Sequence, residues 1–243
     1  YKSSRMRALR TKMQIVFQDP YSSLPPRSTV GGILAEAVKV HKIVPPSDVK
    51  DYVLSVMDRC GLRDYYYERY PHEFSGGQRQ RICIARALVV NPNFVVCDEP
   101  VSALDVSIQA QIINLLKTLQ QERKLTYLFI SHDLSVVKYI SDKIGVRYLG
   151  SMVEFGDKDK IFGNPMHPYT EALFSAVPNP NPDVKVKRIL LSGDIPSPAN
   201  PPMGCKFHTR CPRAMEVCKH IAPRYKEYEP GHFVACHCYS QED

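Results

Sequence analysis

Residues 74–105 carry three short polar motifs, and these limit strongly the folds that this 243-residue chain can adopt. The motifs read F-S-G-G-Q-R-Q-R from Phe74, V-V-C-D-E-P from Val95 and S-A-L-D from Ser102. A serine and two glycines at the start of a helical pattern leave unpaired N–H groups, which attract phosphate. An apolar strand that ends in two carboxylates offers a ligand for Mg²⁺ and a group that can orient or deprotonate water. The segment therefore predicts phosphate chemistry.

Two continuous apolar runs, Phe94–Cys97 and Tyr127–Ile130, are typical of parallel strands that are covered on both faces. Apolar residues recur at helical spacing over residues 108–119, which completes a β-α-β unit. A right-handed crossover brings the ends of both strands to one edge of the sheet. We therefore expect an α/β fold in which three polar side chains converge at that edge: Asp98, Glu99 and His132.

The amino-terminal part of the chain predicts one strand and two helices. The strand is expected at Gln14–Phe17, directly before Gln18. Residues 30–69 are expected to be mostly helical, because apolar residues form two stripes at helical spacing. Two prolines, Pro45 and Pro46, separate the helices, and Ser47 is expected to be the N-cap of the second.

Beyond residue 143 the pattern changes twice. A strand is expected at Ile144–Leu149, with a hairpin partner at Met152–Phe155. Residues 163–202 hold 9 of the 20 prolines, so we expect an extended connector rather than more of the sheet. A helix is expected to begin at His167 and Pro168.

In chain order, these motifs resemble those of the ATPase subunit of an ABC transporter. The resemblance rests on the signature Phe74–Gln78, the Walker B strand Val95–Glu99, the D-loop Ser102–Asp105, the H-switch His132 and the Q-loop residue Gln18. Residues 167–173 and 195–198 resemble, more narrowly, the carboxy-terminal extension of oligopeptide and dipeptide importer ATPases.

The resemblance implies an α/β fold class: a P-loop NTPase-like ABC ATPase core, incomplete here, with a helical subdomain and a Pro/Cys-rich extension. The expected domains are a partial ABC ATPase domain over 1–162, with its helical subdomain at about 28–90, and the extension over 163–243. No G-x-x-x-x-G-K-[S/T] phosphate loop occurs in the sequence. We therefore expect an amino-terminally truncated subunit that lacks Walker A and is inactive by itself.

The resemblance also implies the role of each site residue in ATP hydrolysis. Glu99 orients and polarises the attacking water, His132 contacts the γ-phosphate, and Gln18 senses that phosphate. Asp98 holds Mg²⁺, and Asp105 reaches across a dimer of ATPase domains. The signature residues contact the γ-phosphate of an ATP that is held mainly by the partner: Ser75, Gly76, Gly77 and Gln78.

The implied partners are a second ABC ATPase subunit in a head-to-tail dimer, two transmembrane permease subunits and, indirectly, an extracytoplasmic substrate-binding protein. The expected location is the cytoplasmic face of the cell membrane, because no apolar run is long enough for a membrane span and no signal segment opens the chain. Nucleic acid is not expected as a partner, since the basic residues behind the net charge of +7 are dispersed among acids.

Two other classes of function share some of these motifs. One is a non-transport ABC protein, which would lack the extension and the cysteine tail. The other is a nucleotide-dependent regulatory protein without a complete ATP site, which the missing phosphate loop favours. The transported substrate is open among a dipeptide, a longer peptide, glutathione and a metal chelate.

Five of the eight cysteines lie in the last 39 residues, which in a cytosolic chain favours metal over disulfides. Four of them, Cys205, Cys211, Cys218 and Cys236, are spaced C-x5-C-x6-C-x17-C. Four thiolates can hold zinc or a [4Fe-4S] cluster, and the absence of tight C-x2-4-C pairs favours the cluster. Cys238 could replace Cys236. The candidate alternative zinc ligands, expected at the surface, are His208, His220, His232 and His237.

Overall fold

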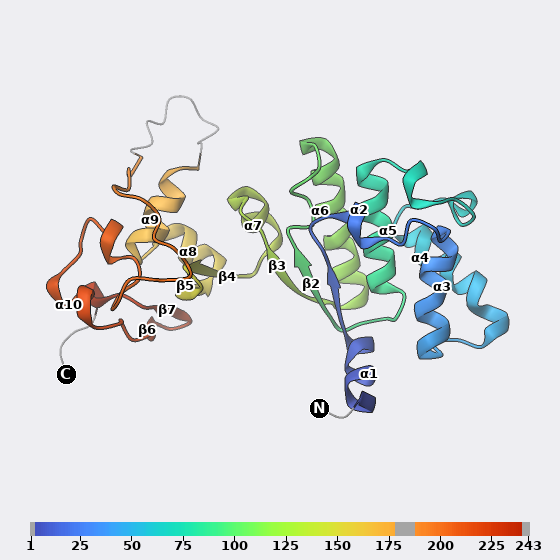
Figure 1. Cartoon of the computed structure of the whole chain (residues 1–243), viewed down its shortest axis with the longest axis horizontal. Coiled ribbons are helices and arrows are strands. Elements are labelled where there is room, and N and C mark those ends of the chain that lie inside the picture. Colours follow the sequence, from blue (N-terminus) through green and yellow to red (C-terminus); the bar gives the residue numbers. More distant parts are fainter. Residues whose placement is uncertain (1–2, 178–187, 240–243) are drawn as a thin grey trace. The chain divides into compact units, whose positions relative to one another are not determined.

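The computed structural model describes residues 3–177 and 188–239, and these form two compact units, Tyr1–Val136 and Val137–Asp243 (Figure 1). The division falls earlier than the expected domain boundary at 162/163. The physical reason is that the hairpin predicted at 144–149 and 152–155, which the structure has at residues 143–157, joins a sheet with strands from the cysteine tail. The expected assignment of 1–162 and 163–243 stays a prediction.

The first unit is built on a three-stranded parallel sheet in the order β1-β2-β3. Its strands are β1 (Met13–Val16), β2 (Phe94–Asp98) and β3 (Thr126–Ile130). Ile15 pairs with Val96 and Val96 with Leu128, so the three strands end at the same edge. The three predicted strands are confirmed, with ends that differ by one residue, and so is the parallel direction expected for the second and third; the pairing of β1 with β2 was not predicted.

One face of this sheet is apolar and covered. Val16 and Cys97 are buried on it, and β1 contacts helix α5 (Gly76–Leu88), which also packs against helix α6 (Val106–Arg123). On the other face Ile15 and Leu128 are exposed in the described part of the chain. The expectation that the strands are covered on both faces is therefore wrong for these residues.

The α5–α6 contact depends on Gly77. A Cβ atom at Gly77 would lie 2.5 Å from Cγ2 of Ile108 on α6, which is closer than side-chain atoms approach. A Cβ at Gly76 would lie 3.4 Å from Leu104, an ordinary van der Waals distance. The second glycine of the signature is thus required by packing, whereas the first is exposed.

Helices make up the rest of the first unit (Figure 1). They are α1 (Ser3–Lys12), α2 (Pro20–Ser23), α3 (Val30–His41), α4 (Val49–Arg59) and the 3-10 turns η1 (Pro46–Asp48), η2 (Asp64–Tyr66) and η3 (Pro71–Glu73). The two predicted helices after residue 30 are confirmed. Ser47 is not the N-cap of α4, because η1 precedes the helix and Asp48 takes the cap position; the Ser47 hydroxyl donates to Asp48 instead.

The second unit holds a four-stranded antiparallel sheet in the order β4-β5-β7-β6. The predicted hairpin is confirmed as β4 (Lys143–Tyr148) and β5 (Ser151–Asp157). The tail adds β6 (Lys226–Glu229) and β7 (His232–Val234), which the sequence analysis did not predict. Helix α7 (Leu134–Ile140) spans the division between the two units. The other helices and 3-10 turns of the second unit are α8 (Lys158–Gly163), α9 (Pro168–Ser175), η4 (His208–Arg210), α10 (Glu216–His220) and η5 (His237–Tyr239).

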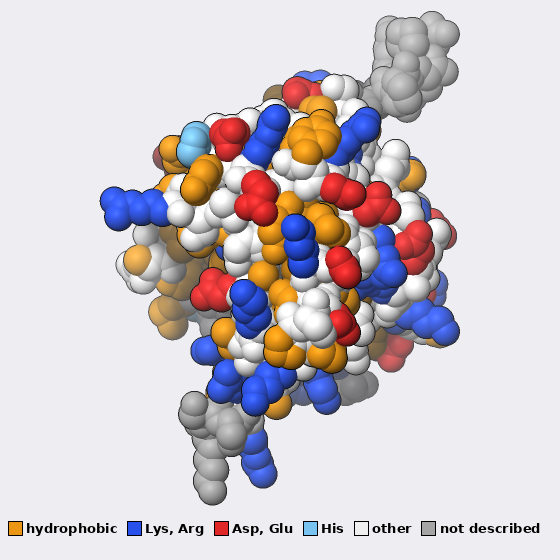
Figure 2. All heavy atoms as spheres, turned by 90° about the vertical axis from the view of Figure 1, so that its right-hand side faces the viewer, with side chains coloured by type: hydrophobic (Ala, Val, Ile, Leu, Met, Phe, Trp, Pro, Cys, Tyr) orange, Lys and Arg blue, Asp and Glu red, His pale blue; other side chains and the backbone are white. Residues whose placement is uncertain are grey.

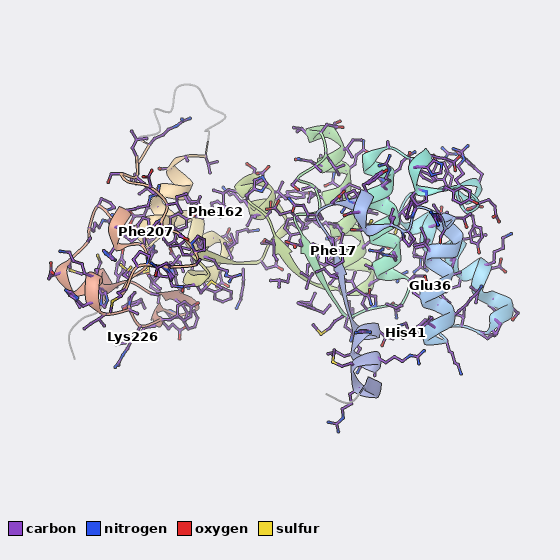
Figure 3. The ribbon with its side chains drawn as sticks, in the orientation of Figure 1. Phe17, Glu36, His41, Phe162, Phe207 and Lys226 are labelled. Atoms are coloured by element: carbon purple, nitrogen blue, oxygen red, sulfur yellow. The ribbon has the colours of Figure 1, made fainter. Side chains whose placement is uncertain are left out.

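Phe207 is the centre of the second unit's apolar core (Figure 3). It is 1% exposed, and its ring packs edge-on against Tyr148 and lies 5.4 Å from the ring of Tyr169. The predicted helix start at His167 is confirmed, since His167 is the N-cap of α9. The connector is extended only in part, because α9 lies within it, and its residues 178–187 lie outside the described part of the chain.

A buried carboxylate ties α9 to the sheet. Glu154 on β5 is fully buried, and it accepts hydrogen bonds from the backbone N–H groups of Met166 and His167 at 2.8 and 3.0 Å. His232 on β7 lies 2.8 Å from the same carboxylate. His232 is fully buried, so the expectation of a surface histidine there is wrong; a polar partner on the neighbouring strand makes its burial acceptable.

We expect Gly77→Ala to lower the free energy of unfolding by about 1–3 kcal/mol, because the new methyl group overpacks against Ile108. Urea denaturation measures the loss. Gly76→Ala on the same helix is the matched control and should change stability by less than about 0.5 kcal/mol. Equal effects of the two substitutions would contradict the packing account.

A second prediction concerns pH. Burial lowers the pKa of His167 from 6.5 to about 4. The unfolded chain therefore binds more protons than the folded one between these values, and stability is lost as the pH falls from 6.5 towards 4. His167→Asn keeps an N-cap acceptor and removes the titrating ring. Between pH 7 and pH 4 we expect the wild type to lose about 3 kcal/mol more than this variant in urea denaturation; identical losses would refute the assignment.

Candidate functional site

Glu99 lies where the sheet of the first unit ends, and both of its carboxylate oxygens are engaged. Gln18, two residues after β1, donates from Nε2 to Glu99 Oε2 at 2.8 Å. His132, two residues after β3, places Nδ1 at 3.2 Å from Glu99 Oε1. An ionised carboxylate only accepts, so this contact puts a proton on Nδ1 and leaves Nε2 to a ligand. The structure thus brings together the three residues that the sequence singled out for catalysis.

The backbone of Glu99 is held in an unusual conformation. Its φ angle is +44°, in the left-handed region that costs a side-chain-bearing residue about 1–3 kcal/mol. Three hydrogen bonds stabilise it. The Glu99 N–H donates to the Ile130 carbonyl on β3 at 3.0 Å, and the Glu99 carbonyl accepts from the Ser102 N–H at 3.3 Å and from the Ser102 hydroxyl at 3.1 Å. Such strain is concentrated at functional positions. The strained backbone therefore lowers the stability of the fold, and it directs the Glu99 carboxylate towards Gln18 and His132.

The partners of Glu99 are placed by capped helix starts. After Gln18, the Asp19 carboxylate accepts from the backbone N–H of Tyr21 and Ser22 at the start of α2, and these bonds lower the pKa of Asp19. After His132, the Asp133 carboxylate accepts from the N–H of Ser135 at 2.8 Å at the start of α7. An aspartate cap directly after each polar residue fixes where the strand stops and the helix begins.

Asp98 is the last residue of β2, directly before Glu99, and its side chain is half-buried. A carboxylate at this place is a hard oxygen ligand of the kind that Mg²⁺ takes together with substrate phosphates and water. Such an ion needs only one or two protein carboxylates, so Asp98 fits it without further protein ligands. The expected Mg²⁺ ligand therefore lies beside the expected catalytic group.

The signature forms the start of α5. Ser75 is the N-cap: its hydroxyl accepts from the Gln78 N–H at 3.4 Å, while the Gln78 side chain accepts from the Ser75 N–H at 3.0 Å. Ser75 and Gly76 are exposed, whereas Gly77 is buried under Ile108. The first amides of a helix have no partner within it, so the exposed end can take an anion.

Asp105 closes the D-loop and is the N-cap of α6. Its carboxylate accepts from the Ile108 N–H at 3.0 Å and from the Ser107 hydroxyl at 2.8 Å, which lowers its pKa. The side chain is exposed. The structure therefore gives Asp105 a capping role, and its expected contact with a second ATPase domain stays a prediction.

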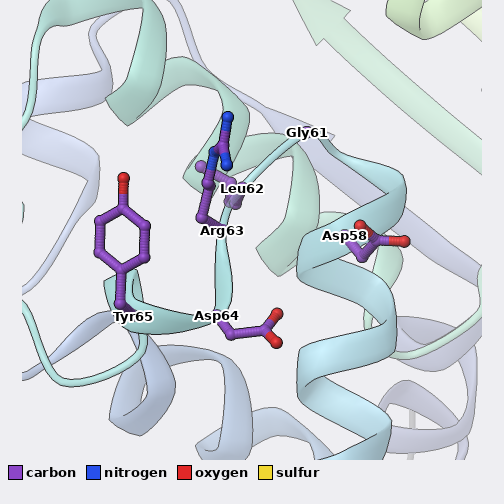
Figure 4. A pocket seen from close by; sticks show the side chains of 6 residues that line it. All are labelled: Asp58, Gly61, Leu62, Arg63, Asp64 and Tyr65. Carbon is purple, nitrogen blue, oxygen red and sulfur yellow. The ribbon is translucent and has the colours of Figure 1, made fainter.

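The surface offers a hollow away from these residues. It has a volume of about 540 Å³ and is lined by the end of α4 and the start of η2: Asp58, Gly61, Leu62, Arg63, Asp64 and Tyr65 (Figure 4). None of the expected site residues lines it. On the face shown in Figure 2, acidic and basic side chains are interspersed over most of the surface. Over residues 3–177 and 188–239, no helix combines the length and apolar character needed to cross a membrane.

The five cysteines of the tail lie in the second unit, where the Cys205 N–H donates to the Cys218 carbonyl at 2.8 Å. All eight cysteines lie in the described part of the chain, and none of them forms a disulfide. Burial raises the pKa of the Cys211 thiol, and the neighbouring thiols of Cys238, Cys205 and Cys218 act in the same direction. Burial also raises the pKa of Cys236 to about 12, with Cys238 and Cys211 beside it.

Proximity alone does not make a metal site. Within the described residues, no group of three or more His, Cys, Asp or Glu side chains is arranged so that it could hold a metal ion. The expected ligand set Cys205, Cys211, Cys218 and Cys236 is therefore without support from the side-chain arrangement. Thiolates rather than thiols are the ligands, so binding would have to deprotonate these groups.

Three contacts near the site were missed by the sequence analysis. The Tyr66 hydroxyl lies 3.1 Å from Nε2 of the signature residue Gln78, Ser102 bonds to the Glu99 carbonyl, and Gln109 bonds to the D-loop. Gln109 lies four residues after the N-cap Asp105, one turn along α6, where a side chain can reach back over the helix start. That spacing is the only signal in the sequence that could have pointed to it.

Two family patterns match the chain. Residues 1–102 match the family described as "ABC transporter", and residues 153–218 match "Oligopeptide/dipeptide transporter, C-terminal region". Both agree with the resemblance found in the motifs.

The chain is also similar to curated proteins over most of its length. It is 56% identical over 236 residues to the oligopeptide transport ATP-binding protein AppF of Bacillus subtilis, which is 96% of this chain and 72% of AppF. It is 53% identical over 234 residues to the dipeptide transport ATP-binding protein DppF of Escherichia coli, which is 96% of this chain and 70% of DppF.

Solved structures with the same fold include cbiO1 of Clostridium perfringens, part of the ABC transporter complex cbiONQ, with a TM-score of 0.60 and 28% identity. A dimeric ATP-binding cassette, MJ0796 bound to ADP and Pi, has a TM-score of 0.52 and 27% identity. The cbiO1 match covers 68% of this chain and 64% of cbiO1, and the MJ0796 match covers 60% of this chain and 62% of MJ0796. This chain therefore spans less than two thirds of the length of each solved chain. The expected α/β ABC fold class is confirmed, and the chain belongs to the family of ATP-binding subunits of oligopeptide and dipeptide ABC transporters.

Proposed function

We propose that this chain is the ATP-hydrolysing subunit that powers peptide import through an ABC transporter of the oligopeptide/dipeptide class. The observation that carries the proposal is the hydrogen-bonded group of Gln18, Glu99 and His132 at one edge of the sheet. The names of the relatives supply the substrate class: AppF is an oligopeptide and DppF a dipeptide transport ATP-binding protein.

The reaction transfers the γ-phosphoryl group of ATP to water, and catalysis of this kind is chiefly positioning and electrostatic stabilisation. In the proposal, Glu99 orients the attacking water and polarises it, with Asp98 as the Mg²⁺ ligand beside it. His132 contacts the γ-phosphate through Nε2, since Nδ1 faces Glu99. A donor at Nε2 together with the Nδ1–H bond to Glu99 requires a proton on both ring nitrogens. Gln18 bonds to the other Glu99 oxygen, and in the proposal it senses the γ-phosphate through the carboxylate that it holds.

The site is completed by a second ATPase subunit. The proposed arrangement is a head-to-tail dimer in which the exposed start of α5, at Ser75 and Gly76, meets the γ-phosphate of an ATP bound mainly by the partner. A dimeric solved relative, MJ0796, supports such an assembly. Residues 1–243 contain no G-x-x-x-x-G-K-[S/T] run, so these residues do not supply the phosphate cradle themselves.

The remaining partners and the location follow from the transporter class. We propose two transmembrane permease subunits as direct partners and a substrate-binding protein as an indirect one. The chain would then sit peripherally on the cytoplasmic face of the membrane. The size of the transported peptide is left open, because one relative is named for oligopeptides and the other for dipeptides.

We expect Glu99→Gln to lower the rate of ATP hydrolysis on the order of 10²–10⁴-fold, the loss typical of a removed general base. The amide keeps the shape of the carboxylate and one acceptor oxygen, and Asp98 and the start of α5 are unchanged, so ATP should stay bound and hold the dimer closed. ATP hydrolysis and bound nucleotide are measured in the assembled transporter. Glu122→Gln, an exposed change on α6, is the control. Undiminished turnover of the Glu99 variant would rule out the role.

For the tail, we propose a structural [4Fe-4S] cluster on Cys205, Cys211, Cys218 and Cys236, with zinc as the alternative metal. The spacing of the cysteines in the sequence is what supports this proposal. The role would be structural: a metal site of this type contributes on the order of 10 kcal/mol to folding.

Elemental analysis tests the cluster. We expect iron and acid-labile sulfide in equal amounts in protein purified without oxygen, and loss of both in Cys211→Ser, which removes one ligand. Cys60→Ser is the control, because Cys60 is buried in the first unit. Zinc without iron in the purified protein would point to the alternative metal and contradict the cluster.

A further inference from the structure

We propose that Gln109 is a positioning residue that fixes the D-loop and, through it, the backbone of Glu99. The inference rests on the proposed ATP hydrolysis and adds a residue to it that the ABC motifs do not contain. It is carried by a chain of hydrogen bonds that leads from α6 to the strained glutamate.

The first link is the Gln109 side-chain amide. Its Nε2 atom donates to the Val101 carbonyl at 3.0 Å and to the Leu104 carbonyl at 2.9 Å. Gln109 is half-buried, and it lies one turn after the N-cap Asp105. Since an amide NH₂ has two protons and both are used on one loop, the side chain clamps the two sides of the turn.

The second link is the turn itself. The Leu104 N–H donates to the Val101 carbonyl at 3.1 Å, and the Ser102 N–H donates to the Glu99 carbonyl at 3.3 Å. The Ser102 hydroxyl donates to the same Glu99 carbonyl at 3.1 Å. Val101 directly precedes Ser102 in the chain, so a displacement of Val101 or Leu104 reaches Glu99 through at most two residues.

The third link is the strain at Glu99. With φ at +44°, this backbone would relax if its surroundings did not hold it. Its N–H is held by the Ile130 carbonyl of β3, and its C=O is held by Ser102 from the D-loop. In the proposal, Gln109 holds Val101 and Leu104 and thereby keeps Ser102 in position to bond to the Glu99 carbonyl.

The chemistry of the contact requires an amide at position 109. Methionine has nearly the same length and shape but no donor, so it leaves two carbonyls without a partner. A carboxylate of the same shape brings acceptor oxygens against two carbonyl oxygens and repels both. Gln109→Glu should therefore be at least as harmful as Gln109→Met, which a role in packing alone does not predict.

The effect should fall on turnover rather than on nucleotide binding. Gln109 contacts no group that we assign to ATP, and a small displacement of a reacting group alone can lower a rate by up to about a hundredfold. We expect kcat for ATP hydrolysis to fall about tenfold in Gln109→Met, with KM for ATP within about twofold of the wild type.

The experiment compares Gln109→Met and Gln109→Glu with Gln121→Met, a control on the exposed side of the same helix. Two readouts are taken: kcat and KM for ATP in the assembled transporter, and hydrogen–deuterium exchange of a peptide that covers residues 99–105 in this chain. The Ser102 and Leu104 amides report the turn, and their exchange should be about tenfold faster in both Gln109 variants and unchanged in the control.

Faster exchange together with a selective loss of kcat supports the proposal. Unchanged exchange in the D-loop overturns it, and so does faster exchange with unchanged kcat. If neither variant folds, Gln109→Asn, which keeps an amide on a side chain one methylene shorter, weakens the same two hydrogen bonds and gives the comparison. A wild-type transporter that does not hydrolyse ATP refutes the proposed function; the exchange readout still decides whether Gln109 holds the loop.

Discussion

The candidate site of the first unit is arranged around one carboxylate, that of Glu99. Glu99 is held in a left-handed backbone conformation between β2 and the D-loop, and its two oxygens face Gln18 and His132 from the ends of the other two strands. Parallel strands deliver all three residues to one edge of the sheet, which is the place where open α/β sheets bind ligands. The fold therefore brings together residues that are far apart in the sequence.

Helix caps set the geometry around this carboxylate. Asp19, Ser75, Asp105 and Asp133 each bond to the first amides of a helix, and each lies within or directly beside a motif that the sequence singled out. A cap fixes the residue at which an extended segment turns into a helix, and so it fixes the direction of the neighbouring side chain. In this protein the polar motifs are helix starts as well as candidate binding groups, and both roles use the same unpaired N–H groups.

Much of this could be predicted from the sequence. Apolar patterns located the three strands of this sheet to within one residue, and the continuous runs of the second and third indicated that these two are parallel. The crossover rule placed Asp98, Glu99 and His132 at one edge. The rest depended on long-range contacts. Neither β6 nor β7 has a clear alternating pattern of apolar residues. His232 is buried only because Glu154 lies on the neighbouring strand. Gln109 bonds to a turn whose conformation cannot be predicted from the sequence. Metal ligation by the tail cysteines stays a prediction.

The central claim is that Gln18, Glu99 and His132 act as one unit. A double-mutant cycle tests it most directly, with Gln18→Ala, His132→Ala and the double variant compared for kcat of ATP hydrolysis in the assembled transporter. Because both side chains hold the same carboxylate, we predict strong non-additivity, with the double variant losing little more than the worse single variant. Losses that add in free energy would show that the two residues act independently and would contradict the account.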